Sequence, residues 1–320
     1  MRGCGDQYPV GETDSPPGCT TLEIVMFLDK TIATLGSMTD LPHHVLVYGG
    51  DHSPWVQTVL LGIAERNIPY TIITAPPFNV FNRWGVLMPA ARINGQPWML
   101  QSEAILCELG FEQIGRDDKR AIIRSARGGV HRIDSARRFW QEWSLVRDGA
   151  PGFLSRSKHS FFRAFSVLYF HLALSQLSRD PRSRTDTKGY ERQFLYWEEQ
   201  LTQSEGAFID GEKPGTRDFM LFGVLQCHAS IEVPPVAVLQ TSQALPMVRG
   251  WIAAMQNRYP EYHHLYSGTY FEPARSKPEE ASVIEQVAFW LGSVVVLLAF
   301  PLTVPLALYY QKKVRREKLL

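Results

Sequence analysis

The order of short elements between Val45 and Gly110 constrains the fold more than any other part of the chain. Asn94-Gly95, inside the stretch 88–100, is a strong local signal for a two-residue hairpin turn between two short strands. Four further stretches predict a strand at 45–48, a helix at 55–64, a strand at 70–73 and a helix at 101–109. The order strand, helix, strand, loop, strand, strand, helix predicts a mixed α/β module.

Composition excludes several classes of function. With 320 residues, 45% hydrophobic and 20% charged, the chain is long enough for two domains with a substantial core. The formal net charge of +1 offers no general excess of cation for phosphates, so we expect no nucleic-acid partner. The four cysteines form no CxxC and show no metal-like spacing, so we expect neither a metal site nor a disulfide framework.

The second half of the chain reads as helical. Aromatic residues recur at helical spacing from Phe139 to about Tyr266, which predicts an all-helical bundle. Most of these rings are expected in the core, with Trp140 and Trp143, or Phe161 and Phe165, as candidates to line an apolar pocket. The preceding charged stretch, 113–138, is read as a domain linker or as a charged helix broken by a glycine pair.

The C-terminal part carries no charged residue from Val287 to Tyr310, a run of 24 positions. At about 1.5 Å per residue this run reaches about 36 Å, enough for a hydrocarbon core of about 30 Å. Tyr309-Tyr310 and the basic tail 311–320 are typical of an interface anchor. We therefore predict one transmembrane helix, which Pro301 and Pro305 either kink or divide.

Three dipeptides resemble the N-terminal domain of glutathione transferases: Ser53-Pro54, Met88-Pro89 and Gln101-Ser102. In the second half, Gly215 and Asp218 resemble the start of that family's late buried helix, with Thr216 as a substitute cap. The resemblance implies an α/β thioredoxin-like domain, then an all-α bundle. The predicted parts are a largely disordered extension at 1–43, the thioredoxin-like domain at 44–112, a charged linker at 113–138, the helical domain at 139–268, a second linker at 269–286, the membrane helix at 287–310 and the basic tail.

The resemblance also assigns roles to residues. Ser53 would donate a hydrogen bond to the glutathione thiolate at the start of a helix, although Ser followed by Pro is equally a good structural cap. Tyr48 is the rival hydroxyl. Met88, before an expected cis-Pro89, would pair its backbone with the cysteinyl part of glutathione, and Gln101 and Ser102 would hold the γ-glutamyl group. His52 has no identifiable acidic partner, which argues against a hydrolase.

Two functions follow from the resemblance. One is a membrane-tethered transferase that joins glutathione, as co-substrate, to an apolar electrophile. The other is a catalytically weak adaptor that places a transferase-like surface on an organelle. The expected topology is a single-pass C-terminal anchor with the globular part in the cytosol, and the short basic tail favours the mitochondrial outer membrane, with endoplasmic reticulum and peroxisome left open. The resemblance implies a homodimer, which the sequence does not show.

Overall fold

The computed structural model describes residues 42–129, 136–147, 152–177, 187–229, 234–266 and 279–317, all within one unit, Pro42–Leu320. The predicted extension 1–43 lies almost wholly outside these residues, as do positions 267–278 of the second linker and the last three residues of the tail.

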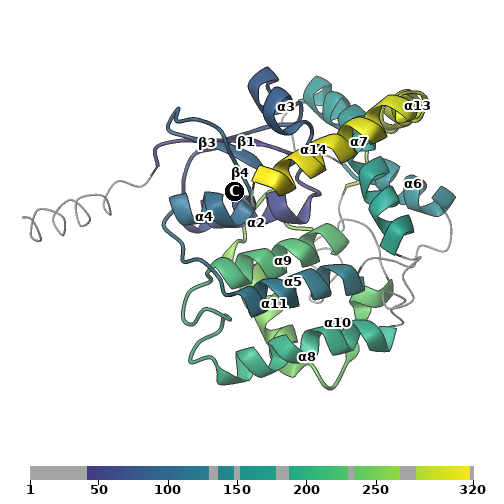
Figure 1. Cartoon of the computed structure of the whole chain (residues 1–320). Coiled ribbons are helices and arrows are strands. Elements are labelled where there is room, and N and C mark those ends of the chain that lie inside the picture. Colours follow the sequence, from purple (N-terminus) through teal and green to yellow (C-terminus); the bar gives the residue numbers. More distant parts are fainter. Residues whose placement is uncertain are drawn as a thin grey trace, which may run out of the picture. The chain divides into compact units, whose positions relative to one another are not determined.

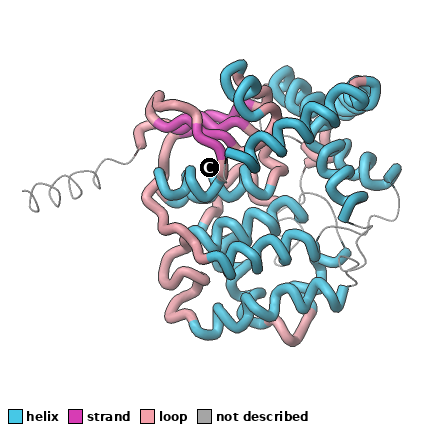
Figure 2. The backbone as a smooth tube through the Cα atoms, in the orientation of Figure 1, coloured by secondary structure: helices cyan, strands magenta, loops and turns pink. Residues whose placement is uncertain are grey.

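The sheet has four strands in the order β2-β1-β3-β4, and Figure 2 draws them in magenta. Its strands are β1 (Val45–Tyr48), β2 (Tyr70–Ile73), β3 (Ala90–Ile93) and β4 (Met99–Leu100). β1 runs parallel to β2 and antiparallel to β3, and β3 runs antiparallel to β4. Asn94 and Gly95, with φ of 48° and 76°, form the turn, because both backbone positions need the left-handed region. The predicted hairpin is confirmed, and this strand order is that of a thioredoxin-like domain.

Three helices belong to this sheet: α2 (Pro54–Glu65), α3 (Phe78–Trp84) and α4 (Ser102–Glu108). α2 and α4 match the predicted helices to within two residues. α3 was expected as a loop, because two prolines precede it and its seven residues are too few for a clear helical period.

The second half is helical, as predicted (Figure 1). Its elements are α5 (Arg116–Gly129), α6 (Ala136–Leu145), α7 (Phe153–Leu177), α8 (Thr187–Gln203), α9 (Thr216–Ala229), the 3-10 turn η2 (Pro234–Ala237), α10 (Val238–Thr241) and α11 (Pro246–Arg258). Most of the predicted linker 113–138 is therefore a helix. α5 packs on α8 and α9 through its apolar positions, including Ala121 and Ile122, so the helical alternative holds for 116–129.

α9 is the central helix, with nearly every side chain buried. Its start is fixed by Asp218, whose carboxylate accepts the backbone N–H groups of Ile209, Asp210 and Gly215 and the indole N–H of Trp251. The resemblance to the late-helix motif is confirmed at Asp218. Thr216 is the first residue of α9 and not the residue before it, and its hydroxyl donates to the carbonyl of Glu112, 2.5 Å away.

The predicted single helix 287–310 is wrong. The segment forms two helices, α13 (Val283–Leu298) and α14 (Phe300–Glu317), that meet at a bend of 78°. The break falls at Ala299, two residues before Pro301, because proline lacks the N–H group that would continue the helix and its ring clashes with the preceding turn. Among the described residues no single helix is long and apolar enough to cross a bilayer; only the bent pair meets that condition, by length and composition.

α13 and α14 both return to the body (Figure 1). α13 packs along α7, and α14 reaches α3 at the edge of the sheet. Glu285 meets Arg156 and Gly292 meets Phe161, so α13 and α7 run side by side in the same direction.

Candidate functional site

The candidate site lies where three segments meet at one end of the sheet. The loop between β1 and α2 contacts Met88, since the Gly50 N–H donates to the Met88 sulfur at 3.4 Å. The Met88-Pro89 bond is cis, as expected. The backbone N–H of Gln101 then donates to the carbonyl of Pro89 at 3.3 Å. The fold thus brings Ser53, Met88, Pro89, Gln101 and Ser102 into one continuous region.

Ser53 occupies the N-cap position of α2, but its hydroxyl makes no capping hydrogen bond. Its backbone carbonyl accepts the first helical bond, from Gln57, and Pro54 follows at the first helical position. The side chain is half-buried and lines a pocket together with Gly50, Asp51 and His52. Ser53 therefore stands at the cap position without making the capping hydrogen bond, and the residue lines the pocket.

Tyr48 is placed differently. Its ring is only 1% exposed and lies in an apolar cluster with Val80, Trp84, Ala90 and Val314. A hydroxyl on a ring held in this way is poorly placed to meet a dissolved thiol. The geometry favours Ser53 over Tyr48.

Gln101 has an unusual backbone conformation, with φ of 90° and ψ of 127°. Residues with a Cβ rarely adopt a positive φ, and such positions concentrate at functional sites. Gln101 is exposed, whereas Ser102 is 7% exposed at the first position of α4. The backbone is therefore held in a strained form at the position predicted to meet the γ-glutamyl group.

The far wall of the Ser53 pocket comes from α7, which supplies His159, Phe162, Arg163 and Ser166. Of the aromatic candidates, Trp143 packs edge-on against His52 at 4.9 Å between ring centroids, and Trp140 packs against Phe289. Phe162 lines the pocket instead. The enclosed volume is about 30 Å³, room for about two water molecules, so a tripeptide would have to extend along the rim.

A buried polar network holds the loop that carries Ser53. Asp51 accepts the hydroxyl of Tyr266 at 2.6 Å and pairs with His264 Nδ1 at 3.0 Å. Burial would raise the pKa of the Asp51 carboxyl, but His52 and the bonds from His264 and Tyr266 outweigh it and hold that pKa well below its ordinary value. Asp51 is therefore an anion near neutral pH.

His52 does have an acidic partner, contrary to the prediction. Its Nε2 lies 3.4 Å from the Asp51 carboxylate, and its ring stacks on Tyr266 with centroids 4.9 Å apart. Asp51, His264 and Tyr266 were all missed from the sequence. Residues more than 200 positions apart give no local pattern, and only an Asp-His pair beside Ser53 could have pointed to the network.

The resemblance would allow Arg83 and Arg92 to contact the glycyl carboxylate of glutathione, with surface solvation as the simpler interpretation of both, and the structure shows both side chains in other contacts. Arg92 donates to the carbonyls of Gly95 and Gln96 inside the hairpin turn. The Arg83 guanidinium lies over the ring of Trp84, 4.7 Å from its centroid. Both side chains are exposed, which agrees with solvation as the simpler interpretation.

No protein-family model and no curated protein matches the chain. Among solved structures, glutathione S-transferase I bound with lactoylglutathione is 18% identical, with 70% of this chain and 99% of that chain covered and a TM-score of 0.37. Poplar glutathione transferase F1 is 14% identical, at 70% and 98% coverage and a TM-score of 0.39. An unclassified glutathione S-transferase 2 from Bombyx mori is 10% identical, at 72% and 97% coverage and a TM-score of 0.40.

Proposed function

We propose that this protein is a membrane-associated glutathione transferase in which Ser53 stabilises the thiolate of glutathione. The observation that carries the proposal is Ser53 itself, which stands at the N-terminus of α2, makes no capping hydrogen bond with its hydroxyl and lines a pocket. A free thiol has a pKa near about 8.5, and a hydrogen-bond donor at a helix N-terminus lowers it. Ser53 would donate to the sulfur and remain protonated itself.

The residues around Ser53 would bind the other parts of glutathione. The backbone at Met88 and Pro89 would pair with the cysteinyl backbone, and Gln101 and Ser102 would hold the γ-glutamyl end. The second substrate would enter from the side of Phe162 on α7. An apolar electrophile suits Phe162, the one large apolar side chain among the residues that line this pocket. The homodimer stays a prediction.

A non-catalytic adaptor is the second candidate, and a specific observation favours it. The pocket beside Ser53 is small, and α14 packs Tyr310 and Val314 against the sheet edge that leads to Met88. A site occupied by the protein's own side chains would serve as a surface rather than as a catalyst. The two functions separate on whether the chain binds glutathione and forms thioether products.

The test compares two serines at helix starts. Ser53→Ala removes a hydroxyl that makes no cap bond, whereas Ser282→Ala removes a real cap, since Ser282 Oγ accepts the N–H of Glu285. We expect Ser53→Ala to lower conjugation of glutathione to an aryl halide by tenfold or more with little change in stability. Ser282→Ala should cost about 1 kcal/mol of stability and leave the conjugation rate unchanged.

The measurements are steady-state conjugation and denaturant unfolding, on the full chain in mild detergent, with retention on immobilised glutathione. Absence of both retention and conjugation in the unaltered protein would favour the adaptor. If Ser53→Ala lost stability and activity to the same degree, Ser53 would be a structural residue.

We also propose that the 287–310 segment attaches the protein to a membrane, with the body in the cytosol and the mitochondrial outer membrane as the first compartment to test. Its uncharged composition and basic flank support this proposal.

A further inference from the structure

α13 presents two apolar faces, of which one is buried. Phe289, Gly292 and Val296 are buried against the body. The opposite stripe, spaced three or four residues apart along the helix, is exposed and apolar throughout: Ile284, Val287, Trp290, Leu291, Val294 and Leu298. A helix with two apolar faces needs both of them covered, and here the body covers only one face.

The buried face of α13 packs closely on α7 and also contacts α6. A Cβ at Gly292 would lie 2.3 Å from the carbonyl oxygen of Phe161, so the two backbones are in direct contact there. Two turns earlier, the Glu285 carboxylate is 1% exposed and pairs with Arg156 Nε at 2.7 Å. Lifting α13 into hydrocarbon would separate this ion pair and leave both charges unpaired. α13 is therefore part of the folded body.

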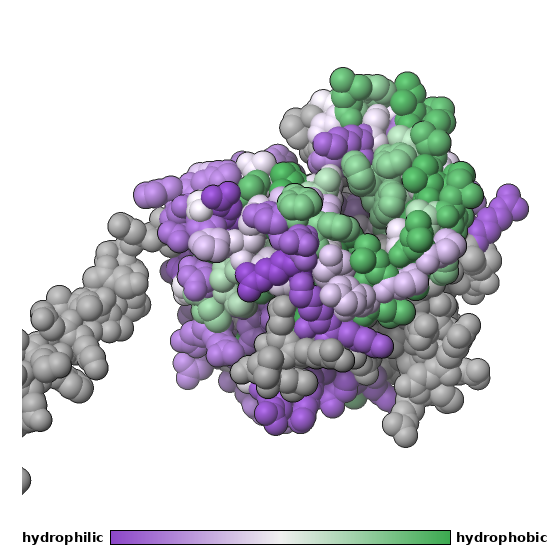
Figure 3. Space-filling model, turned by 45° about the horizontal axis from the view of Figure 1, so that its top comes forward, coloured by the Kyte–Doolittle hydropathy of each residue, from purple (hydrophilic) through white to green (hydrophobic). Residues whose placement is uncertain are grey.

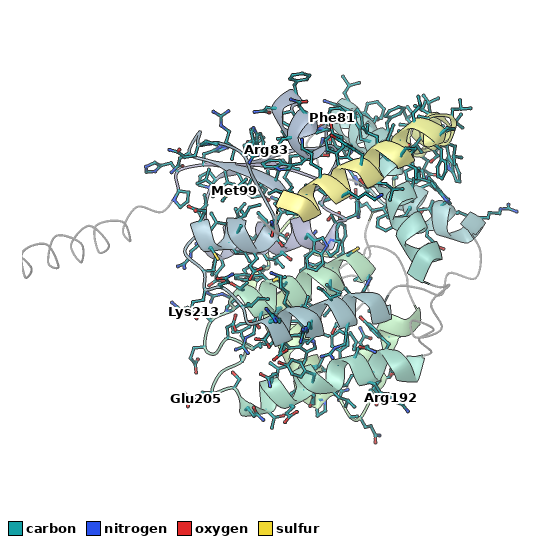
Figure 4. All side chains as sticks on the ribbon, in the orientation of Figure 1. Phe81, Arg83, Met99, Arg192, Glu205 and Lys213 are labelled. Atoms are coloured by element: carbon teal, nitrogen blue, oxygen red, sulfur yellow. The ribbon has the colours of Figure 1, made fainter. Side chains whose placement is uncertain are left out.

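α14 repeats the arrangement after the 78° bend. Its inner side places Tyr310 against Gly85 and Phe81, and Val314 against the sheet (Figure 4 labels Phe81 on α3). Its outer side exposes Leu302, Leu306 and Tyr309. Lys312 is exposed one turn beyond, so the apolar stripe ends in positive charge.

The outer stripes of α13 and α14 together form what we call the apolar face, and Figure 3 shows hydrophobic residues gathered on this part of the surface. Trp290 and Tyr309 carry a polar atom on an apolar ring, which suits the headgroup level of a bilayer. Lys312 and Lys313, with the basic residues after them, complement anionic headgroups. Soluble monomers rarely expose a continuous apolar surface of this kind.

We propose that the apolar face lies in one leaflet of an anionic membrane, with α13 and α14 in the plane of the interface and the basic tail on the same side as the body. This inference rests on the proposed membrane attachment and replaces its single-pass form with one-sided binding. The occupant of the face is lipid, and a second copy of the chain is an outcome that the test can reveal.

The experiment adds the full chain, diluted from detergent, to sealed vesicles of phosphatidylcholine with 30% phosphatidylserine, and follows flotation. We expect Leu291→Glu with Val294→Glu to lower the floated fraction at least tenfold. Leu195→Glu is the matched control, since Leu195 is exposed on α8 to a similar degree, and it should float like the unaltered protein. Circular dichroism checks that each variant is folded.

Trypsin added outside the vesicles then reports the sidedness of the tail. One-sided binding predicts that the basic tail is cleaved in intact vesicles, at sites such as Lys312 and Lys313. Flotation with a protected tail, cleaved only after the vesicles are opened, overturns one-sided binding and leaves membrane attachment standing. Absence of flotation overturns both, and a dimer by light scattering in that case assigns the face to a second copy.

Discussion

Asp218 and His228 lie on the same buried helix, α9, and burial shifts their pKa values with opposite effects on stability. Burial lowers the pKa of His228 to about 4. Burial, with the nearby charge of Asp210, raises the pKa of Asp218 to about 6. The unfolded chain therefore holds more proton at His228 between pH 4 and 6.5, and the folded chain holds more at Asp218 between pH 4 and 6. The contribution of His228 to the free energy of unfolding therefore decreases as pH falls, and the contribution of Asp218 decreases as pH rises.

Single variants should reveal these two opposed dependences of stability on pH. At about 1.4 kcal/mol per pKa unit, each group contributes about 3 kcal/mol across this window, so the two nearly cancel in the unaltered protein. We expect the stability of His228→Gln to fall from pH 4 to 6, and that of Asp218→Asn to rise from pH 4 to 6.5. Denaturant unfolding at several pH values measures the slopes. If both variants showed the same dependence of stability on pH as the unaltered protein, the assignment of these pKa shifts to His228 and Asp218 would be contradicted.

At the scale of elements, α14 sits at the edge of the candidate site. Tyr310 occupies the space that a side chain at Gly85 would need, 2.4 Å from its Cβ position. Val314 shares a cluster with Tyr48 and Trp84, and Met88 packs against the same cluster. α14 therefore packs on the cluster that Met88 also joins, so the proposed membrane face and the proposed glutathione site would share one helix.

Two adjacent tyrosines lie on the inner and the outer side of α14. Tyr310 is 9% exposed and Tyr309 is 60% exposed. Tyr310→Ala should release α14 from α3 and speed tryptic cleavage at Lys312 and Lys313 on the order of tenfold, since burial of a large side chain is worth about 1.5–3 kcal/mol. Tyr309→Ala should leave cleavage unchanged in detergent. Mass spectrometry of timed digests gives the rates, and equal rates would show that the Tyr310 contact does not hold α14.

At the scale of the whole described unit, the sheet and the helical half are locked together at the end that carries Ser53. A Cβ at Gly223 of α9 would lie 2.6 Å from the carbonyl oxygen of Pro54, the first residue of α2. Glu65, at the other end of α2, pairs with Arg258 and accepts the hydroxyl of Tyr259. Asp51 binds His264 and Tyr266 from the segment after α11. The position of Ser53 thus depends on residues of the helical half.

A methyl group at Gly223 should weaken the packing of α9 on α2. Gly223→Ala is expected to destabilise the protein by about 1–3 kcal/mol, because backbone atoms cannot move aside easily. Gly250→Ala, in α11 with open space around it, should instead stabilise by up to about 1 kcal/mol through helix propensity. Guanidinium unfolding compares the two. If Gly223→Ala proved neutral, the close approach of α9 to α2 would not hold the halves together.

The sequence by itself determined the features that are written locally: the four strands, the Asn94-Gly95 turn, the helix starts at Pro54 and Ser102, and the Asp218 motif. Each depends on side-chain period or backbone preference over a few neighbouring residues. Only the tertiary structure decided that Ser53 does not cap its helix, that Asp51 meets His264 and that 116–129 is a packed helix. It also decided that the two helices on either side of the break near Pro301 dock on α7 and α3. These outcomes depend on contacts between segments far apart in the chain, where packing against Gly292 and Gly85 outweighs the local apolar pattern.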